Sequence, residues 1–270
     1  MKLSAGISLL ALTATIAFAG RNAPPTLRID RKGDIPATPW VFVMPGSGVV
    51  DAATRPPDGP GDLCYAFFCS LENEGFMVTV AVFDDAVSTD NCNAGSTSCP
   101  AWDDDAVEVF IDGEYARLPD SRSDGGIHLK HGGEFSLVAN GAAMSDFSGY
   151  HNSFARLQDG GGRRPEGFGT STNALWTGEV RRDGAMFRDH LLALPECPKG
   201  FAPDGTIETD YMFHFSWAAM GRTNRPERIG FNIGVQDDDD GHRRDHTLYW
   251  TGNPARPFSD ESAFGTIVLD

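Results

Sequence analysis

Trp102 and Glu108 have side chains of the types that could recognise a sugar. Trp102 lies in a loop after Cys99-Pro100 and before three aspartates, where an exposed indole would give a C–H-rich sugar face a flat surface for stacking. A tryptophan that only covers the edge of the fold is the alternative. Glu108 lies in a strand-like run, on the face opposite Val107 and Val109. Its carboxylate can accept hydrogen bonds from two neighbouring hydroxyl groups.

Aspartates gather in three groups, Asp84-Asp85, Asp103–Asp105 and Asp237–Asp240, at the ends of strand-like runs or just beyond them. Clustered carboxylates repel one another unless they are hydrated, paired with cations or bound to a metal. Calcium prefers several oxygen ligands supplied by loops. We therefore predict structural Ca²⁺, with ligands drawn from Asp84, Asp85, Asp104, Asp237 and Asp238. The alternative is a solvated acidic rim, partly neutralised by His242, Arg243 and Arg244. No EF-hand spacing is present.

Strand-like runs separated by turn signals supply the scaffold for these residues, and no long amphipathic helical pattern appears. The runs 64–70 and 76–83, with a turn at 72–75 between them, predict a β-hairpin. Further strands are predicted at 40–43, 106–112, 134–140, 175–182, 211–217, 229–235, 245–250 and 264–269, with a short helical turn near 218–220. Regular strands without intervening helices favour an all-β fold, an antiparallel β-sandwich with long loops, similar to a jelly roll.

Four blocks in this order, 102–112, 229–240, 248–250 and 264–270, resemble the signature of a family 9 carbohydrate-binding module. The resemblance covers roughly residues 60–270. It implies a sugar slot in which Trp102 forms one wall, Phe258 occupies the position of a second aromatic wall, and Glu108 hydrogen-bonds sugar hydroxyls. It also implies structural calcium. A loop residue folded back onto the core is the alternative for Phe258. A related superfamily of DOMON-like sandwiches binds haem through His and Met, for which Met144 and His151 are the conspicuous candidates, in no recognisable pattern.

Gly230, Asn232 and Gly234 alternate on one face of the 229–235 strand, opposite Ile229, Phe231, Ile233 and Val235. Two glycines on one face leave a depression for a ligand or a covering loop, and Asn232 could offer its amide there. The chain departs from the family pattern at the polar contacts of the slot, where it has Ser136, Val138, Gly234 and Ala255. The residues in nearby loops that could substitute are His128, His131, Asn140, Arg163 and Arg164.

The first residues read as a secretory signal peptide, 1–19, with Lys2, an apolar run and a small-residue cleavage pattern that ends at Ala19. We expect cleavage there and an exported product, either extracellular or periplasmic. Residues 20–60 are predicted to form an N-terminal strand and a Pro/Gly-rich loop that pack on the domain. Residues 61–270 are predicted to form the carbohydrate-binding-module-like sandwich.

An exported chain with 5 cysteines is expected to form disulfides. Cys92 and Cys99 flank a flexible loop and are the predicted pair. Cys64 and Cys69 share one strand but point to opposite faces, so they are not expected to bond each other. One of them could reach Cys197. The pairing of these last three stays open.

The formal net charge of −16 argues against nucleic acid and anionic membranes as partners, and no run is long enough to span a bilayer. Zinc, haem, nucleotide and serine-hydrolase motifs are absent from the sequence. We predict a secreted, non-catalytic protein that binds sugars or polysaccharide ends between aromatic side chains, with a role in polysaccharide catabolism. The alternatives are a carbohydrate-active hydrolase that acts on O-glycosyl bonds, and a calcium-stabilised adhesion domain whose sugar slot has decayed.

Overall fold

The computed structural model describes residues 23–29, 37–72, 74–94, 96, 99–119, 132–146, 176–182, 186–220 and 222–269. The predicted signal peptide and its cleavage site at Ala19 lie outside the described residues, as do His128, His131, His151, Arg163 and Arg164. Within the described part of the chain, no helix is long and apolar enough to cross a membrane.

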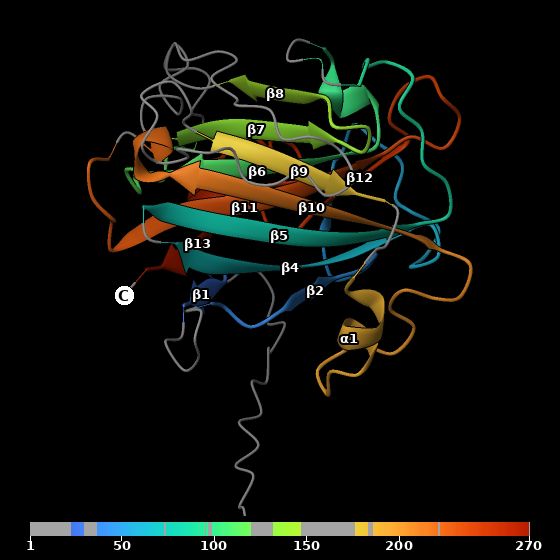
Figure 1. The fold of residues 1–270 in the computed structure, drawn as a ribbon, viewed down its shortest axis with the longest axis horizontal. Coiled ribbons are helices and arrows are strands. Elements are labelled where there is room, and N and C mark those ends of the chain that lie inside the picture. The colour runs from blue at the N-terminus through green and yellow to red at the C-terminus, as the bar shows by residue number, and fades with distance from the viewer. Residues whose placement is uncertain are drawn as a thin grey trace, which may run out of the picture.

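Two β-sheets overlap in the view of Figure 1 and form a sandwich. The five-stranded sheet has the order β2 (Val41–Val43), β4 (Leu63–Glu72), β5 (Gly75–Asp84), β10 (Ile207–Ser216) and β9 (Trp176–Arg181). The eight-stranded sheet runs β1 (Thr26–Arg28), β13 (Gly265–Val268), β11 (Arg228–Asp237), β6 (Ala106–Asp112), β7 (Gly132–Val138) and β8 (Ala143–Asp146). Its last two strands, β12 (His246–Tyr249) and β3 (Val49–Val50), extend from β11. The predicted all-β sandwich is confirmed.

The predicted hairpin is β4–β5, which turns where Glu72 pairs with Gly75. Among the described residues, the named strands pair antiparallel except β1 with β13, which is parallel. The sequence did not reveal β1, because it is short and lies in a segment of weak alternation. Residues 20–60 thus contribute strands to both sheets rather than a single strand.

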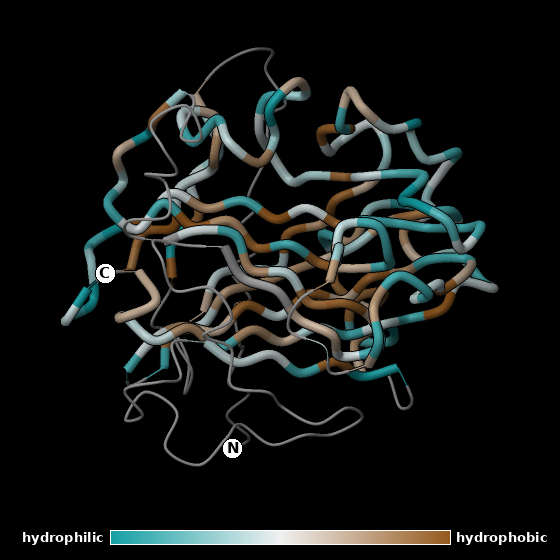
Figure 2. Tube along the Cα trace, turned by 90° about the horizontal axis from the view of Figure 1, so that it is seen from above, coloured by the Kyte–Doolittle hydropathy of each residue, from teal (hydrophilic) through white to brown (hydrophobic). Residues whose placement is uncertain are grey.

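Apolar side chains on one face of each strand meet between the sheets, as their alternation in the sequence predicts. Figure 2 shows hydrophobic segments concentrated in the central strands, with mostly hydrophilic loops around them. The shared core contains Val78 and Val80 of β5, Val109 of β6, and Phe231 and Ile233 of β11. The opposite face of β6 and β11 is therefore directed away from this core, and it carries Glu108 and Asn232.

The outer face of the five-stranded sheet is covered by the connection between β9 and β10. This connection contains the short helix α1 (Arg188–Leu192), whose Leu191 packs with Phe201 against Cys64 and Phe83 of the sheet. The sequence did not predict α1, because five residues are too few for a helical period to show. The short helical turn predicted near 218–220 is present as the 3₁₀ helix η3 (Trp217–Met220).

Candidate functional site

Trp102 lies on the 3₁₀ helix η1 (Ala101–Asp103), which packs against the start of β6 and against β7 and β11. Its side chain is 37% exposed, which makes it one of the few exposed large apolar residues in the described part of the chain. The preceding loop is closed by the predicted disulfide, which joins Cys92 and Cys99. Asn91 also ties this loop, because its side-chain amide donates to the Asp103 carbonyl at 3.0 Å. The indole is thus held at the surface by a restrained loop.

Glu108 lies on the outer face of β6 but is only 3% exposed. Its carboxylate accepts hydrogen bonds from Gln236 Nε2 at 2.5 Å and from Ser136 Oγ at 3.3 Å. Burial, and then the nearby charge of Glu134, raises the pKa of Glu108 to about 8. Glu108 is therefore mostly protonated at neutral pH.

Arg244 supplies a cation close to Glu108. The sequence indicated Arg244 only as a charge that neutralises part of the acidic rim. Its guanidinium donates to Gln236 Oε1 at 3.3 Å and lies 3.9 Å from Asp51. Thr247 donates to the same Gln236 oxygen at 2.6 Å. Gln236 thus connects Glu108 to Arg244 within one polar network on the outer face of the eight-stranded sheet.

Asn232 is fully buried, and its side chain holds a loop. The amide donates to the carbonyls of Thr251 at 3.0 Å and Pro257 at 3.3 Å, and its oxygen accepts from the Thr251 amide. Phe258 follows directly and is partly buried against Phe110, Tyr249 and Phe264. Asn232 therefore positions the loop that carries Phe258.

The depression expected above the β11 glycines is filled by side chains. A Cβ added to Gly234 would lie 2.4 Å from the Tyr249 ring, and one added to Gly230 would lie 2.9 Å from Asp112. Tyr249 therefore occupies the space that the sequence left for a ligand or a loop. Of the other departures from the family pattern, Val138 is buried and Ala255 is exposed.

Trp102 and Phe258 both belong to segments that pack near β6: η1 contacts the strand, and Phe258 packs on the cluster that contains Phe110. The strand begins beside η1, reaches Glu108 after two residues, and then reaches Phe110, against which Phe258 packs. Successive residues on one face of a strand lie about 7 Å apart, so Ala106 and Phe110 are separated by about 14 Å along β6.

At the same end of the sandwich the structure gathers the aspartates. One group consists of Asp84 at the end of β5, Asp105 before β6 and Asp237 at the end of β11, all of them buried. Asp85 lies with Asp84 and Asp239, whereas Asp104 lies with Asp90 and Asp238. The predicted ligands therefore divide between neighbouring groups. The sequence assigned no ligand role to Asp105.

Burial, followed by the charges of neighbouring aspartates, raises the pKa of Asp237 to about 11. It also raises the pKa of Asp105 to about 8 and that of Asp84 to about 7. Asp105 accepts a hydrogen bond from the Asp238 amide at 2.8 Å. Asp237 behaves differently: among the residues that the structure describes, neither of its carboxylate oxygens has a hydrogen-bond partner. A buried carboxylate in this situation needs a cation or a proton.

Asp238 is used by the backbone. Its Oδ1 accepts from the amides of Asp240, Gly241 and His242, and its Oδ2 accepts from the Ser88 hydroxyl. This carboxylate shapes the loop between β11 and β12. Asp237, its neighbour in the sequence, makes no such hydrogen bonds to the described residues.

The remaining cysteines are free thiols. Cys64 and Cys69 point to opposite faces as expected, since Cys64 packs under α1 and Cys69 lies in the central core. Cys197 packs at the edge of the same cluster as Cys64. Asn140, suggested as a sugar contact, donates instead to the Cys92 carbonyl at 2.7 Å and supports the disulfide loop.

Comparison with known proteins shows which folds this architecture resembles. The family model described as "Carbohydrate family 9 binding domain-like" matches residues 206–270, the part that contains β10 to β13. A family 9 carbohydrate-binding module from Caldicellulosiruptor kristjanssonii, solved in complex with cellotriose, aligns with a TM-score of 0.52 and 14% identity over 92% of this chain and 93% of that chain. The chain has the family 9 carbohydrate-binding module fold.

A second structure of a family 9 module from the same organism, in complex with glucose, aligns with a TM-score of 0.50 and 14% identity, over 85% of this chain and 84% of that one. No curated protein sequence matches the chain. The predicted family resemblance is confirmed, and the family 9 fold accounts for the two-sheet architecture. At this level of identity the structural similarity concerns the fold alone.

Proposed function

We propose that this protein is an exported, non-catalytic carbohydrate-binding module that holds a glucan chain end against Trp102. The observation that carries the proposal is the exposed indole of Trp102 on a restrained loop. The family 9 structures in complex with cellotriose and glucose support a glucose-type ligand. Export is supported by the signal-peptide pattern of residues 1–19.

In this proposal Trp102 stacks on the apolar face of a sugar ring, and Phe258 contacts the ring from the other side of Glu108. Glu108, Gln236 and Arg244 form the polar anchor, in which Arg244 supplies the cation.

The Trp102→Ala variant should lose cellotriose binding. Removing the stacking surface of one aromatic side chain costs about 1.5–3 kcal/mol, which corresponds to at least a tenfold weaker affinity. Isothermal titration with cellotriose measures this change. Leu192→Ala is the matched control, because Leu192 is 47% exposed but lies on α1, over the other sheet. Equal affinity of Trp102→Ala and the parent protein would refute the stacking role.

A hydrolase is the second candidate, and Glu108 with Glu134 is the acid pair that would serve it. Both oxygens of Glu108 accept hydrogen bonds from the protein, one from Gln236 and one from Ser136, whereas a retaining glycosidase exposes its two carboxyl groups, about 5–5.5 Å apart, to the scissile bond. Both residues are also buried. This pair therefore favours binding over hydrolysis. Release of reducing sugar from a polysaccharide panel would overturn the non-catalytic proposal.

We also propose that the acidic cluster holds structural calcium at Asp84, Asp105 and Asp237. The fit rests on the unpartnered, buried carboxylate of Asp237 and on an all-oxygen set of ligands. Asp105 lies directly before β6 and contacts the amides of Ser88 and Asp238, so a cation here would stabilise the loop that leads to Trp102. If calcium binds and no sugar does, the adhesion-domain alternative gains support.

A further inference from the structure

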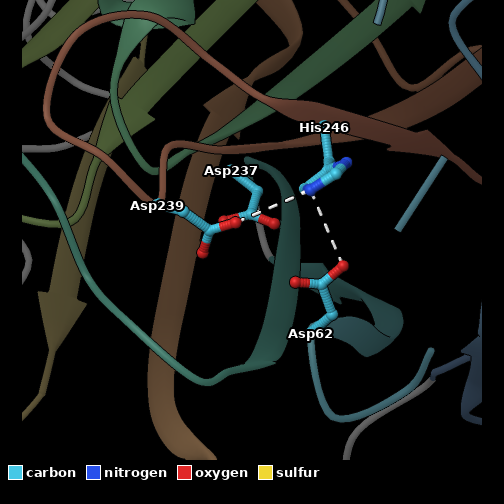
Figure 3. Close-up of side chains that lie close together, drawn as sticks. All are labelled: Asp62, Asp237, Asp239 and His246. Carbon is cyan, nitrogen blue, oxygen red and sulfur yellow. Dashed lines mark ion pairs between the residues drawn. The ribbon is translucent and has the colours of Figure 1, made fainter. Parts of the chain in front are cut away.

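A second group of metal-ligating side chains lies beside the proposed calcium ligands and contains a histidine. Figure 3 shows Asp62, Asp237, Asp239 and His246 pointing toward one another. Asp62 precedes β4, Asp237 ends β11, Asp239 lies in the following loop, and His246 begins β12. One ligand atom from each lies within 4.8 Å of the others. Residues far apart in the sequence thus converge on one point at the end of the sandwich.

The imidazole of His246 is oriented for a cation. Its Nδ1 lies 2.9 Å from the carbonyl oxygen of Arg55. A carbonyl oxygen only accepts hydrogen bonds, so Nδ1 carries the proton and donates. Nε2 faces the Asp62 and Asp239 carboxylates, with 3.6 Å to an oxygen of each. A backbone carbonyl bound to the far ring nitrogen is the usual support of a metal-binding histidine.

An ion pair between His246 and the neighbouring carboxylates does not explain why Asp237 is buried without a hydrogen-bond partner in the described part of the chain. A protonated His246 would satisfy Asp62 and Asp239, yet Asp237 is only 1% exposed and its two oxygens have no hydrogen-bond partner among the described residues. The same carboxylate also belongs to the group of Asp84 and Asp105. Its two oxygens can therefore serve two cations, one in each group.

We propose that Asp62, Asp237, Asp239 and His246 bind a divalent transition-metal ion of the zinc class, next to the calcium ligands and bridged to them by Asp237. An imidazole nitrogen suits zinc, iron, nickel or copper, whereas calcium takes oxygen ligands. Zinc–ligand distances of about 2.0–2.2 Å place the ligands of a tetrahedral site roughly 3.3–3.6 Å apart, close to the separations around His246. Sugar binding does not enter this inference.

Titration of the calcium-loaded protein with Co²⁺, a coloured and paramagnetic substitute for zinc, tests the site. We expect one equivalent of Co²⁺ to bind and to give visible d–d absorption, which added Zn²⁺ abolishes. We also expect a hyperfine-shifted, exchangeable proton resonance from the Nδ1–H of His246, because coordination through Nε2 leaves that proton in place. A parent protein that binds no Co²⁺, or that binds it without this resonance, overturns the proposal.

His246→Gln should weaken Co²⁺ binding at least tenfold and remove the shifted resonance. His190→Gln is the matched control, because His190 is exposed on α1, and it should leave both unchanged. Asp62→Asn provides a second variant that keeps His246 and all three calcium ligands. It should weaken Co²⁺ binding while calcium affinity stays the same. Co²⁺ binding that is equal in the parent and in both variants would show that these residues are not ligands.

Discussion

Glu108 shows how a residue that suits a ligand can be engaged by its own protein. Alternation along the strand correctly placed it on the outer face, and the residue type indicated hydroxyl recognition. Its burial could not be foreseen, because Gln236 and Ser136, which bind its carboxylate, come from neighbouring strands whose register the sequence does not specify. The same holds for Asn232, whose amide holds the loop before Phe258.

The pKa of Glu108 has a consequence for stability. Because the folded-state pKa is about 8, above the ordinary value of 4.5, the folded protein keeps a proton that the unfolded chain releases. The stabilisation is complete below pH 4.5 and is lost as the pH rises to about 8. Glu108→Gln, which mimics the protonated acid, should therefore lose less thermal stability over this range than the parent protein.

Melting temperatures measured from pH 4.5 to 8 in calcium-containing buffer compare the two proteins. Glu227→Gln is the control, because it removes the same charge at an exposed position, directly before β11. If the parent and Glu108→Gln curves run parallel through this range, then Glu108 is not protonated in the folded state.

At the scale of elements, β11 determines the outer face of the sandwich. Ile229 to Val235 was recognised as a strand from its alternation, and its inward side chains lie in the core as expected. The tight approach of Tyr249 to Gly234 was not foreseen, because β12 pairs with β11 at Gly234 only through the tertiary fold. Glycine in this strand serves close packing of a neighbouring ring rather than an open slot.

Gly234→Ala should destabilise the sandwich by about 1–3 kcal/mol, the usual cost of overpacking a filled site. The new methyl group would lie 2.4 Å from the ring of Tyr249, which is 1% exposed and has no free space to enter. Urea unfolding measures the change. Gly59→Ala is the control, because a Cβ there meets nothing within 4 Å. Equal unfolding free energies would mean that Tyr249 moves freely away from β11.

At the scale of the whole molecule, the acidic end of the sandwich joins both sheets. The sequence identified Asp84 and Asp237 because they directly end strong strands. It did not identify Asp62, Asp239 or His246 as ligands, because they belong to loops or short strands and meet only when β4, β11 and β12 are brought together. A single sequence shows aspartates that are neighbours along the chain. It does not show a set of aspartates and a histidine that come from different strands and meet only in the folded protein.

Because the acidic cluster joins both sheets, we expect chelation to weaken the whole fold. The chain has a formal net charge of −16, and removing calcium would leave the buried carboxylates of Asp84, Asp105 and Asp237 to repel one another or to take up protons. A cation present at about 100 times its dissociation constant contributes roughly 2.7 kcal/mol. For a domain of this size we therefore expect chelation to lower the melting temperature by about 5–10 °C.

Differential scanning calorimetry in calcium and in chelator, at equal ionic strength, measures this difference. Sodium chloride should not replace calcium, because screening acts on exposed charges and these carboxylates are buried. Asp237→Asn should melt at the same temperature in both buffers, since the bridging ligand is gone. Because Asp105 also holds the loop before Trp102, chelation should weaken cellotriose binding in the parent protein as well. If chelator leaves the melting temperature of the parent protein unchanged, the buried carboxylates are neutralised by protons rather than by a metal.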